Sequence, residues 1–265
     1  MPHQSITPEA AAILARAADI YRLAIPRRED VHRELRDRHG IRWTTAWKEL
    51  GIGIGGSLAK KAPADGLVRK ELETLGLLDA DGTELLAGFV TVPLHDPQGA
   101  VVALDAFAVN GKASAIPPRR TVPISAPHTG LFNHRVFLEQ TEVFATHDVA
   151  AAVALYTAGL RAVTLVRSAE HWTETVARAA RASKVRRIVF IGSVEIDVAG
   201  AISRDGFDVR VVADGFDILH KCGPAELRKF AETAPAPKYD GSAGLRPAPL
   251  VRLVHPAPEI ERAPL

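Results

Sequence analysis

Apolar residues recur at helical spacing through the first third of the chain and predict helices there. Capping residues, prolines and glycines then set the expected ends of these helices. Four helices are predicted: one from the N-cap Thr7 and Pro8 as far as Pro26, one with Val31 and Leu35 buried that ends at Gly40, one over 43–50 closed by Gly51, and one over 67–75.

The pattern then becomes that of β-strands. Two apolar runs, Leu85–Leu94 and Ala100–Val109, flank the sequence His-Asp-Pro-Gln-Gly at 95–99. Because Asp, Pro and Gly favour tight turns, these runs are predicted to form a β-hairpin. Residues 110–130 contain four prolines together with Arg119 and Arg120, and we expect an ordered loop or linker there.

From about residue 137 onward, short apolar runs alternate with helical patterns. Such alternation predicts a parallel sheet with right-handed crossovers. Strands are expected within 136–145 and over 162–166, 187–191 and 209–213, and helices over 149–157, 170–182 (with Ser168 as a possible cap), 197–204 and 224–232. The fold class is therefore α/β, with a helical and hairpin N-terminal subdomain over 1–130, a Rossmann-like parallel sheet flanked by helices over 136–234, and a Pro-rich arm over 235–265.

Composition limits the class of protein more than its function. The chain has 265 residues, of which 47% are hydrophobic, so it can bury a substantial core. Its single cysteine, Cys222, can form neither an internal disulfide nor a thiolate zinc site, so no zinc is expected. No apolar run approaches the roughly 20 residues of a membrane helix, and the N-terminus does not resemble a signal peptide. We therefore expect a soluble, cytoplasmic chain without a membrane partner.

The charge total does not itself indicate a nucleic-acid partner. The chain has 33 basic and 31 acidic residues, a net charge of +2. A local cluster lies at the end of one predicted helix and the start of the next strand, and it comprises Arg178, Arg181, Lys184, Arg186 and Arg187. These cations can contact phosphates, or they can simply stabilise the negative end of the helix dipole. Both interpretations stay open.

A glycine-rich segment, Gly51–Ser57, invites comparison with phosphate-binding loops. A Walker loop would end in Gly-Lys-Ser/Thr and a dinucleotide loop would follow a strand. Here a helix precedes the glycines, and Lys60 and Lys61 come too late. We therefore interpret the segment as a turn or helix cap.

Two carboxylates follow the predicted strand at 187–191. Ligands of open parallel sheets bind at the carboxyl ends of strands, which is where Glu195 and Asp197 lie. Two acids at such a place repel each other unless a divalent cation lies between them, and Mg²⁺ or Mn²⁺ would suit oxygen ligands. The alternative is a pair of solvated acids at a helix start, which the helix dipole favours.

The order of these elements resembles the catalytic core of bacterial-type DNA primases, whose second half is a Toprim fold. The resemblance covers about residues 20–234, and its order and spacing are more specific than any single motif. The matching segments are Arg38–Ile41 with Leu50-Gly51, Gly88–Gly99, Ala126–Phe132, Ala154–Gly159, Glu195–Gly200, and the closing region from Val209 through Asp217 to Gly223.

This resemblance implies a metal site formed by Glu195, Asp197 and Asp217 and binding of single-stranded DNA or another nucleic acid, with Arg119 and Arg120 added to the basic cluster. The sequence also departs from the family. The position of the Toprim glutamate holds His147, followed by Asp148, and a later aspartate is replaced by Ala151. The lysine expected before Ala126 is missing, as are the zinc ribbon and the helicase-binding domain.

Two functions remain. The first is a primase-like nucleic-acid-binding protein with a degenerate site, a non-catalytic accessory of a replication or mobile-element system that works with a helicase, polymerase or recombinase. The second is an active metal-dependent primase, in which Glu195 and Asp197 hold Mg²⁺ or Mn²⁺ and His147 or Asp148 is the acid/base. A Toprim-type nuclease, a third possibility, would need the same missing glutamate.

Overall fold

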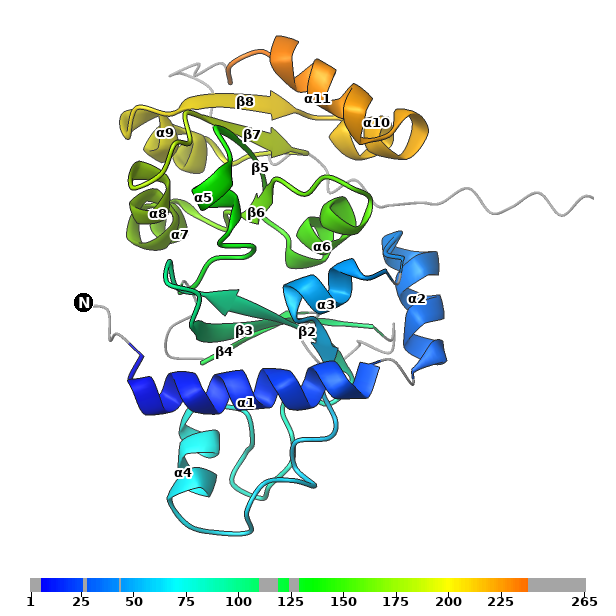
Figure 1. Ribbon diagram of the computed structural model, residues 1–265, viewed down its shortest axis with the longest axis vertical. Coiled ribbons are helices and arrows are strands. Elements are labelled where there is room, and N and C mark those ends of the chain that lie inside the picture. Colours follow the sequence, from blue (N-terminus) through cyan, green and yellow to red (C-terminus); the bar gives the residue numbers. More distant parts are fainter. Residues whose placement is uncertain (1–5, 26–27, 43, 110–118, 124–128, 238–265) are drawn as a thin grey trace, which may run out of the picture.

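Two four-stranded sheets with helices packed around them make up the protein (Figure 1). The computed structural model describes residues 6–25, 28–42, 44–109, 119–123 and 129–237. Several sequence-based expectations lie outside these residues, namely the helix stop at Pro26, the helix start at Trp43, the Ala126–Pro127 part of a primase-like segment and nearly all of the Pro-rich arm. Within the described residues, no helix is long and apolar enough to cross a membrane.

The first sheet is antiparallel, with its strands in sequence order. It consists of β1 (Gly53–Ile54), β2 (Phe89–His95), β3 (Val101–Ala108) and β4 (Arg119–Val122). The predicted hairpin is confirmed as β2 and β3, and the Asp96 carboxylate closes its turn by accepting bonds from the amides of Gln98 and Ala100, both at 2.9 Å. The loop expected over 110–130 was wrong in part, because β4 pairs with β3 there. A four-residue edge strand with half-exposed arginines has little sequence signal, and its partner strand provides the hydrogen bonds.

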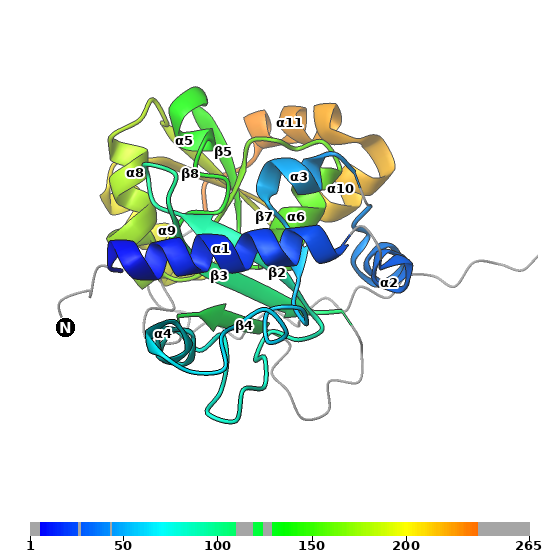
Figure 2. The ribbon, with the colours of Figure 1, turned by 60° about the horizontal axis from the view of Figure 1, so that its bottom comes forward.

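Helix α1 (Pro8–Ala24) lies along one face of the first sheet (Figure 2). Its predicted cap is confirmed, since the Thr7 hydroxyl accepts a bond from the Ala10 amide at 3.2 Å. The buried face of α1 includes Leu14 and Tyr21. The helix comes so near β1 that a Cβ on Gly53 would be 2.4 Å from the Tyr21 carbonyl carbon. Glycine at this position therefore permits the close packing of helix on strand.

The remaining N-terminal helices agree closely with the sequence-based predictions. They are α2 (Glu29–His39), α3 (Ala46–Leu50) and α4 (Leu67–Thr74). As predicted, Gly40 and Gly51 end α2 and α3 in the left-handed conformation, with φ of 63° and 68°. Since L-residues are strained there, glycine fits both caps.

The glycine-rich segment is held by a buried carboxylate. Glu84, which is 6% exposed, accepts bonds from the amides of Gly56 at 2.5 Å, Leu58 at 2.8 Å and Ala59 at 3.1 Å. The amides that a phosphate loop would offer to a ligand are thus already bonded within the protein. The interpretation of 51–57 as only a turn or cap was incomplete, because Gly53 and Ile54 also form β1.

The second sheet is parallel, as the alternating pattern predicted, with strand order β6-β5-β7-β8. Its strands are β5 (Glu142–Thr146), β6 (Val163–Leu165), β7 (Arg187–Ile191) and β8 (Asp208–Val212). The helices around it are α5 (Val136–Glu139), α6 (Val149–Thr157), α7 (Ala169–His171), α8 (Ala177–Arg181), α9 (Ile196–Arg204), α10 (Gly215–Cys222) and α11 (Pro224–Thr233).

Helix α5 and two further details of this half were not predicted. The helix expected over 170–182 consists of α7, a π-helical turn at Trp172–Val176 and α8, although Ser168 caps it as expected. Helix α10 was missed because its glycine and aspartate at the start resemble a turn. The fold class is nevertheless the predicted one, a mixed α/β protein. The division into domains at 130 and 136 stays a prediction. Residues of both sheets share one continuous core, which includes Val90, Phe107 and Val143.

Candidate functional site

The carboxyl ends of β5 and β7 meet at one edge of the parallel sheet. These strands are neighbours, so the residues that follow them, His147 and the segment ending at Glu195, lie at the same edge. A small cavity of about 70 Å³ lies there, and its polar lining comes from His147, Arg167, Ser193 and Glu195. The structure therefore brings together His147 and Glu195, two of the residues singled out from the sequence.

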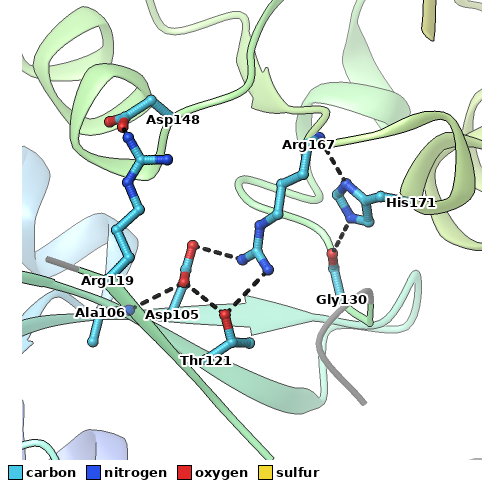
Figure 3. Close-up of polar contacts among 8 residues, drawn as sticks. All are labelled: Asp105, Ala106, Arg119, Thr121, Gly130, Asp148, Arg167 and His171. Carbon is cyan, nitrogen blue, oxygen red and sulfur yellow. Dashed lines mark hydrogen bonds and ion pairs between the residues drawn. The ribbon is translucent and has the colours of Figure 1, made fainter. Parts of the chain in front are cut away.

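Asp148 lies beside His147, but its carboxylate is fully engaged. Its Oδ1 accepts the amide of Ala151 at 2.8 Å and so caps the N-terminus of α6. Its Oδ2 forms an ion pair with Arg119, which reaches over from β4 in the first sheet (Figure 3). A carboxylate bonded on both oxygens is a poor proton acceptor, which argues against Asp148 as the acid/base.

The surroundings of His147 favour its neutral form. Partial burial lowers the pKa of His147, and the nearby Arg119 charge lowers it further, while Glu195 opposes both. A neutral imidazole can accept a proton but supplies no negative charge, and imidazole suits Zn²⁺ or Mn²⁺ better than Mg²⁺.

A buried ion pair links the two sheets next to this cavity (Figure 3). The Arg167 guanidinium, which follows β6, donates to the Asp105 carboxylate of β3 at 2.6 Å. Thr121 of β4 joins the pair, since its hydroxyl donates to Asp105 at 3.1 Å and accepts from Arg167 at 3.3 Å. Burial raises the pKa of Asp105, and Arg167 and Thr121 oppose that change.

His171, which is fully buried, orients the loop that bears Arg167. Its Nδ1 lies 3.2 Å from the Arg167 amide and accepts from it, and its Nε2 lies 3.1 Å from the Gly130 carbonyl oxygen. This arrangement fits a neutral imidazole protonated on Nε2. Two loops from opposite sheets are thereby held against each other.

Sequence reasoning missed Asp105, Thr121, Arg167 and His171. Asp105 had a usable signal, because it is an ionisable residue inside an apolar strand and such residues are buried only with partners. Arg167 had none, since an arginine after a strand usually faces solvent.

The predicted metal ligands are spread over two helices. Glu195 is the N-cap residue of α9, Asp197 lies exposed in its first turn, and Asp217 lies exposed on α10, 3.9 Å from Lys221. Within the described residues, no group of three histidine, cysteine, aspartate or glutamate side chains is placed to hold a metal ion. The side chains at this edge therefore do not fit a divalent cation, because Asp148 is paired with Arg119 and Arg167 lines the same cavity as Glu195.

The predicted basic cluster lies at the opposite edge of the parallel sheet, where the strands begin. Arg181 pairs with Asp205, and Arg187 pairs with Glu142 at 3.1 Å and Asp208 at 2.8 Å. The other members of the cluster, Arg178, Lys184 and Arg186, are exposed. Of the two β4 arginines, Arg119 faces Asp148, whereas the Arg120 guanidinium lies 5.3 Å from the centre of the Phe89 ring. The basic cluster and the cavity are thus separate features.

The chain is a mixed α/β protein with its candidate site at the strand ends. Its antiparallel sheet is joined to its parallel sheet through the ion pair of Asp105 with Arg167. More particularly, its fold is that of the catalytic core of bacterial DNA primases. The RNA polymerase domain of Mycobacterium tuberculosis primase DnaG, in complex with a double-stranded DNA oligomer with a 6-nucleotide overhang, matches with TM-score 0.67 and 19% identity over 89% of this chain and 83% of that one.

Two further solved structures show the same fold. A DNA primase domain from Pseudomonas aeruginosa matches with TM-score 0.66 and 18% identity, over 86% of this chain and 79% of that one. The DnaG primase catalytic domain bound to ssDNA matches with TM-score 0.64 and 14% identity, over 86% and 81%. No family model matches the chain, and no curated protein matches it in sequence. The predicted primase-core resemblance is confirmed at the level of the fold.

Proposed function

We propose that the chain is a primase-like nucleic-acid-binding protein whose Toprim site is degenerate and that it acts as a non-catalytic accessory of a replication or mobile-element system. Primase-related function is supported by the fold, and solved proteins of this fold are described as bound to ssDNA or to overhanging duplex DNA. A helicase, polymerase or recombinase would be its protein partner.

The observation that favours a non-catalytic role is the state of the acid/base position. There the chain has His147, whose pKa is lowered mainly by burial, and Asp148, whose oxygens are bonded to the Ala151 amide and to Arg119. General acid/base catalysis needs a group that is free to exchange a proton at the working pH. Asp148 is not free in this sense, and His147, although its imidazole can accept a proton, lacks the negative charge that a glutamate would supply to a metal ion.

Nucleic acid would bind mainly through phosphate contacts at the exposed part of the basic cluster. Arg178, Lys184 and Arg186 are exposed, whereas Arg181 and Arg187 are paired with acids and are better suited to holding the fold. Such contacts position a backbone without reading its bases. We therefore expect binding of single-stranded DNA with little sequence preference.

Binding is tested by fluorescence anisotropy of a labelled single-stranded oligonucleotide over a range of salt concentrations. Replacing Arg178, Lys184 and Arg186 by alanine should weaken binding and reduce the slope of log affinity against log salt by about 2, since each lost contact to a single strand contributes ~0.7. The control replaces Lys60, Lys61 and Lys70, three exposed lysines in the first half, and should leave the slope unchanged. Equal effects of both triple variants, or a salt-independent affinity, would overturn the binding proposal.

The active-primase alternative makes a separate demand. Template-dependent incorporation of labelled ribonucleotides, with Mg²⁺ or Mn²⁺ present, should be absent from the wild-type chain. Incorporation that disappears in Asp197→Ala would show a working site and would overturn the non-catalytic part of the proposal. DNA binding without incorporation supports both parts.

A further inference from the structure

A guanidinium already occupies the edge of the sheet where a divalent cation would be expected. Arg119 extends from β4 of the first sheet to the carboxyl end of β5 and forms an ion pair with Asp148 (Figure 3). Its charge also acts on His147 and adds to the burial that lowers the pKa of that imidazole. The positive charge in this site thus comes from the chain itself.

A second arginine strengthens the effect. Arg167 lines the same cavity as His147 and Glu195, and it is paired with the buried Asp105 at 2.6 Å. Two of the nearby carboxylates, Asp105 and Asp148, are therefore each neutralised by an arginine. The other two carboxylates at this edge, Glu195 and Asp197, are exposed at the start of α9 and have no ion-pair partner within the described part of the chain.

Such a set of groups disfavours a hard divalent cation. Mg²⁺ and Mn²⁺ at carboxylate sites need oxygen ligands whose negative charge is not already compensated. The Asp148 carboxylate is already compensated by Arg119 and so provides little of this charge, and the guanidinium groups of Arg119 and Arg167 repel a cation. Asp148, the natural second ligand, would have to exchange Arg119 for the metal.

We propose that Arg119 is the built-in counter-ion of this site and excludes Mg²⁺ and Mn²⁺ from it. The site is then metal-independent, and the ion pair of Arg119 with Asp148 links the two sheets there. This proposal concerns the site whose degeneracy the proposed function assumes. It is tested without nucleic acid, so the two can fail independently.

The experiment is a titration of Mn²⁺ with the purified full chain, followed by electron paramagnetic resonance of the free aqueous ion. The wild-type chain should leave the free Mn²⁺ signal unchanged. Arg119→Ala should bind Mn²⁺ at least about tenfold more tightly, because one positive charge next to the ion has been removed. Adding Asp148→Asn to that variant should abolish the gain, and Arg119→Lys, which keeps the charge, should resemble wild type.

Arg120→Ala is the matched control. Arg120 is the next residue of the same strand, but it packs over Phe89. This variant should bind no more Mn²⁺ than wild type. Wild-type binding of one Mn²⁺ that is lost in Asp148→Asn would overturn the proposal outright, whatever the variants do. So would an Arg119→Ala chain that is folded by circular dichroism and binds no Mn²⁺.

Discussion

Replacing Arg167 by leucine should destabilise the protein by about 3 kcal/mol at neutral pH. The pair is buried, with 17% of the Arg167 side chain and 6% of the Asp105 side chain exposed. Removing one partner of a buried pair costs about 3–5 kcal/mol, because the other charge stays buried alone. We take the lower end because Arg167 keeps some solvent contact. For a protein of this size the change corresponds to a fall in Tm of about 6–12 °C.

The loss should depend on pH in a defined direction. Burial already raises the pKa of Asp105, and Arg167 is the main opposing influence, so the variant should have a still higher pKa there. When folding raises the pKa of a carboxyl group, the protonated group favours the folded state at pH values below its pKa in the unfolded chain. This contribution to the free energy of unfolding is lost as the pH rises through the pKa of the folded state. The loss of unfolding free energy in Arg167→Leu, relative to wild type, should therefore be smaller at about pH 5 than at about pH 8.

Urea unfolding at both pH values, followed by tryptophan fluorescence, measures these effects. Arg22→Leu is the control, since Arg22 pairs with Asp19 on the exposed surface of α1 and its loss should cost less than about 1 kcal/mol. The double variant with Asp105→Leu should recover most of the stability, because no buried charge is then left alone. A loss below about 1 kcal/mol, or a loss that is equal at both pH values, would refute this account of the pair.

Three further predictions concern the fold. Glu84→Gln should cost about 2–3 kcal/mol in urea unfolding, because the amide replaces an anion that accepts three backbone bonds; an unchanged midpoint would contradict that role. Gly53→Ala should overpack the contact of α1 with β1, reduce the free energy of unfolding by about 1–3 kcal/mol and so lower Tm. Gly200→Ala on α9, where a Cβ meets nothing within 4 Å, should be neutral or stabilising. Equal effects of the two variants on Tm would argue against close packing on β1. His95 packs against His134 with ring centroids 4.8 Å apart, and burial lowers the pKa of His95 to about 4. Stability should therefore fall as pH drops from about 6.5 to about 4, and His95→Gln should flatten that part of the stability curve measured by urea unfolding.

Local sequence signals predicted most elements of this fold. Thr7, Gly40 and Gly51 fixed helix ends because capping depends on one residue and its immediate neighbours. The turn at 95–99 was predictable for the same reason, since Asp96 bonds to amides within four residues. Strand β4 and helix α10 were not, because an edge strand depends on its neighbour and a helix that starts with Asp-Gly looks like a turn.

The candidate site was predictable only in part. The sequence placed Glu195 after the strand at 187–191, whereas the pairing of β5 with β7, which brings His147 to the same edge, is seen only in the structure. The partners of Asp148 and Asp105 did not follow, because Arg119 and Arg167 lie 29 and 62 residues away from them along the chain. No spacing rule connects residues so far apart.

The sequence by itself determined the fold class and the order of elements, because these depend on local patterns and on residue identity. Only the tertiary structure decided which charges meet. It showed Asp148 paired with Arg119 and Asp105 paired with Arg167, each from another element, and the basic cluster at the far edge of the sheet. Electrostatic interactions depend on distance in space, and the packing of the two sheets sets that distance.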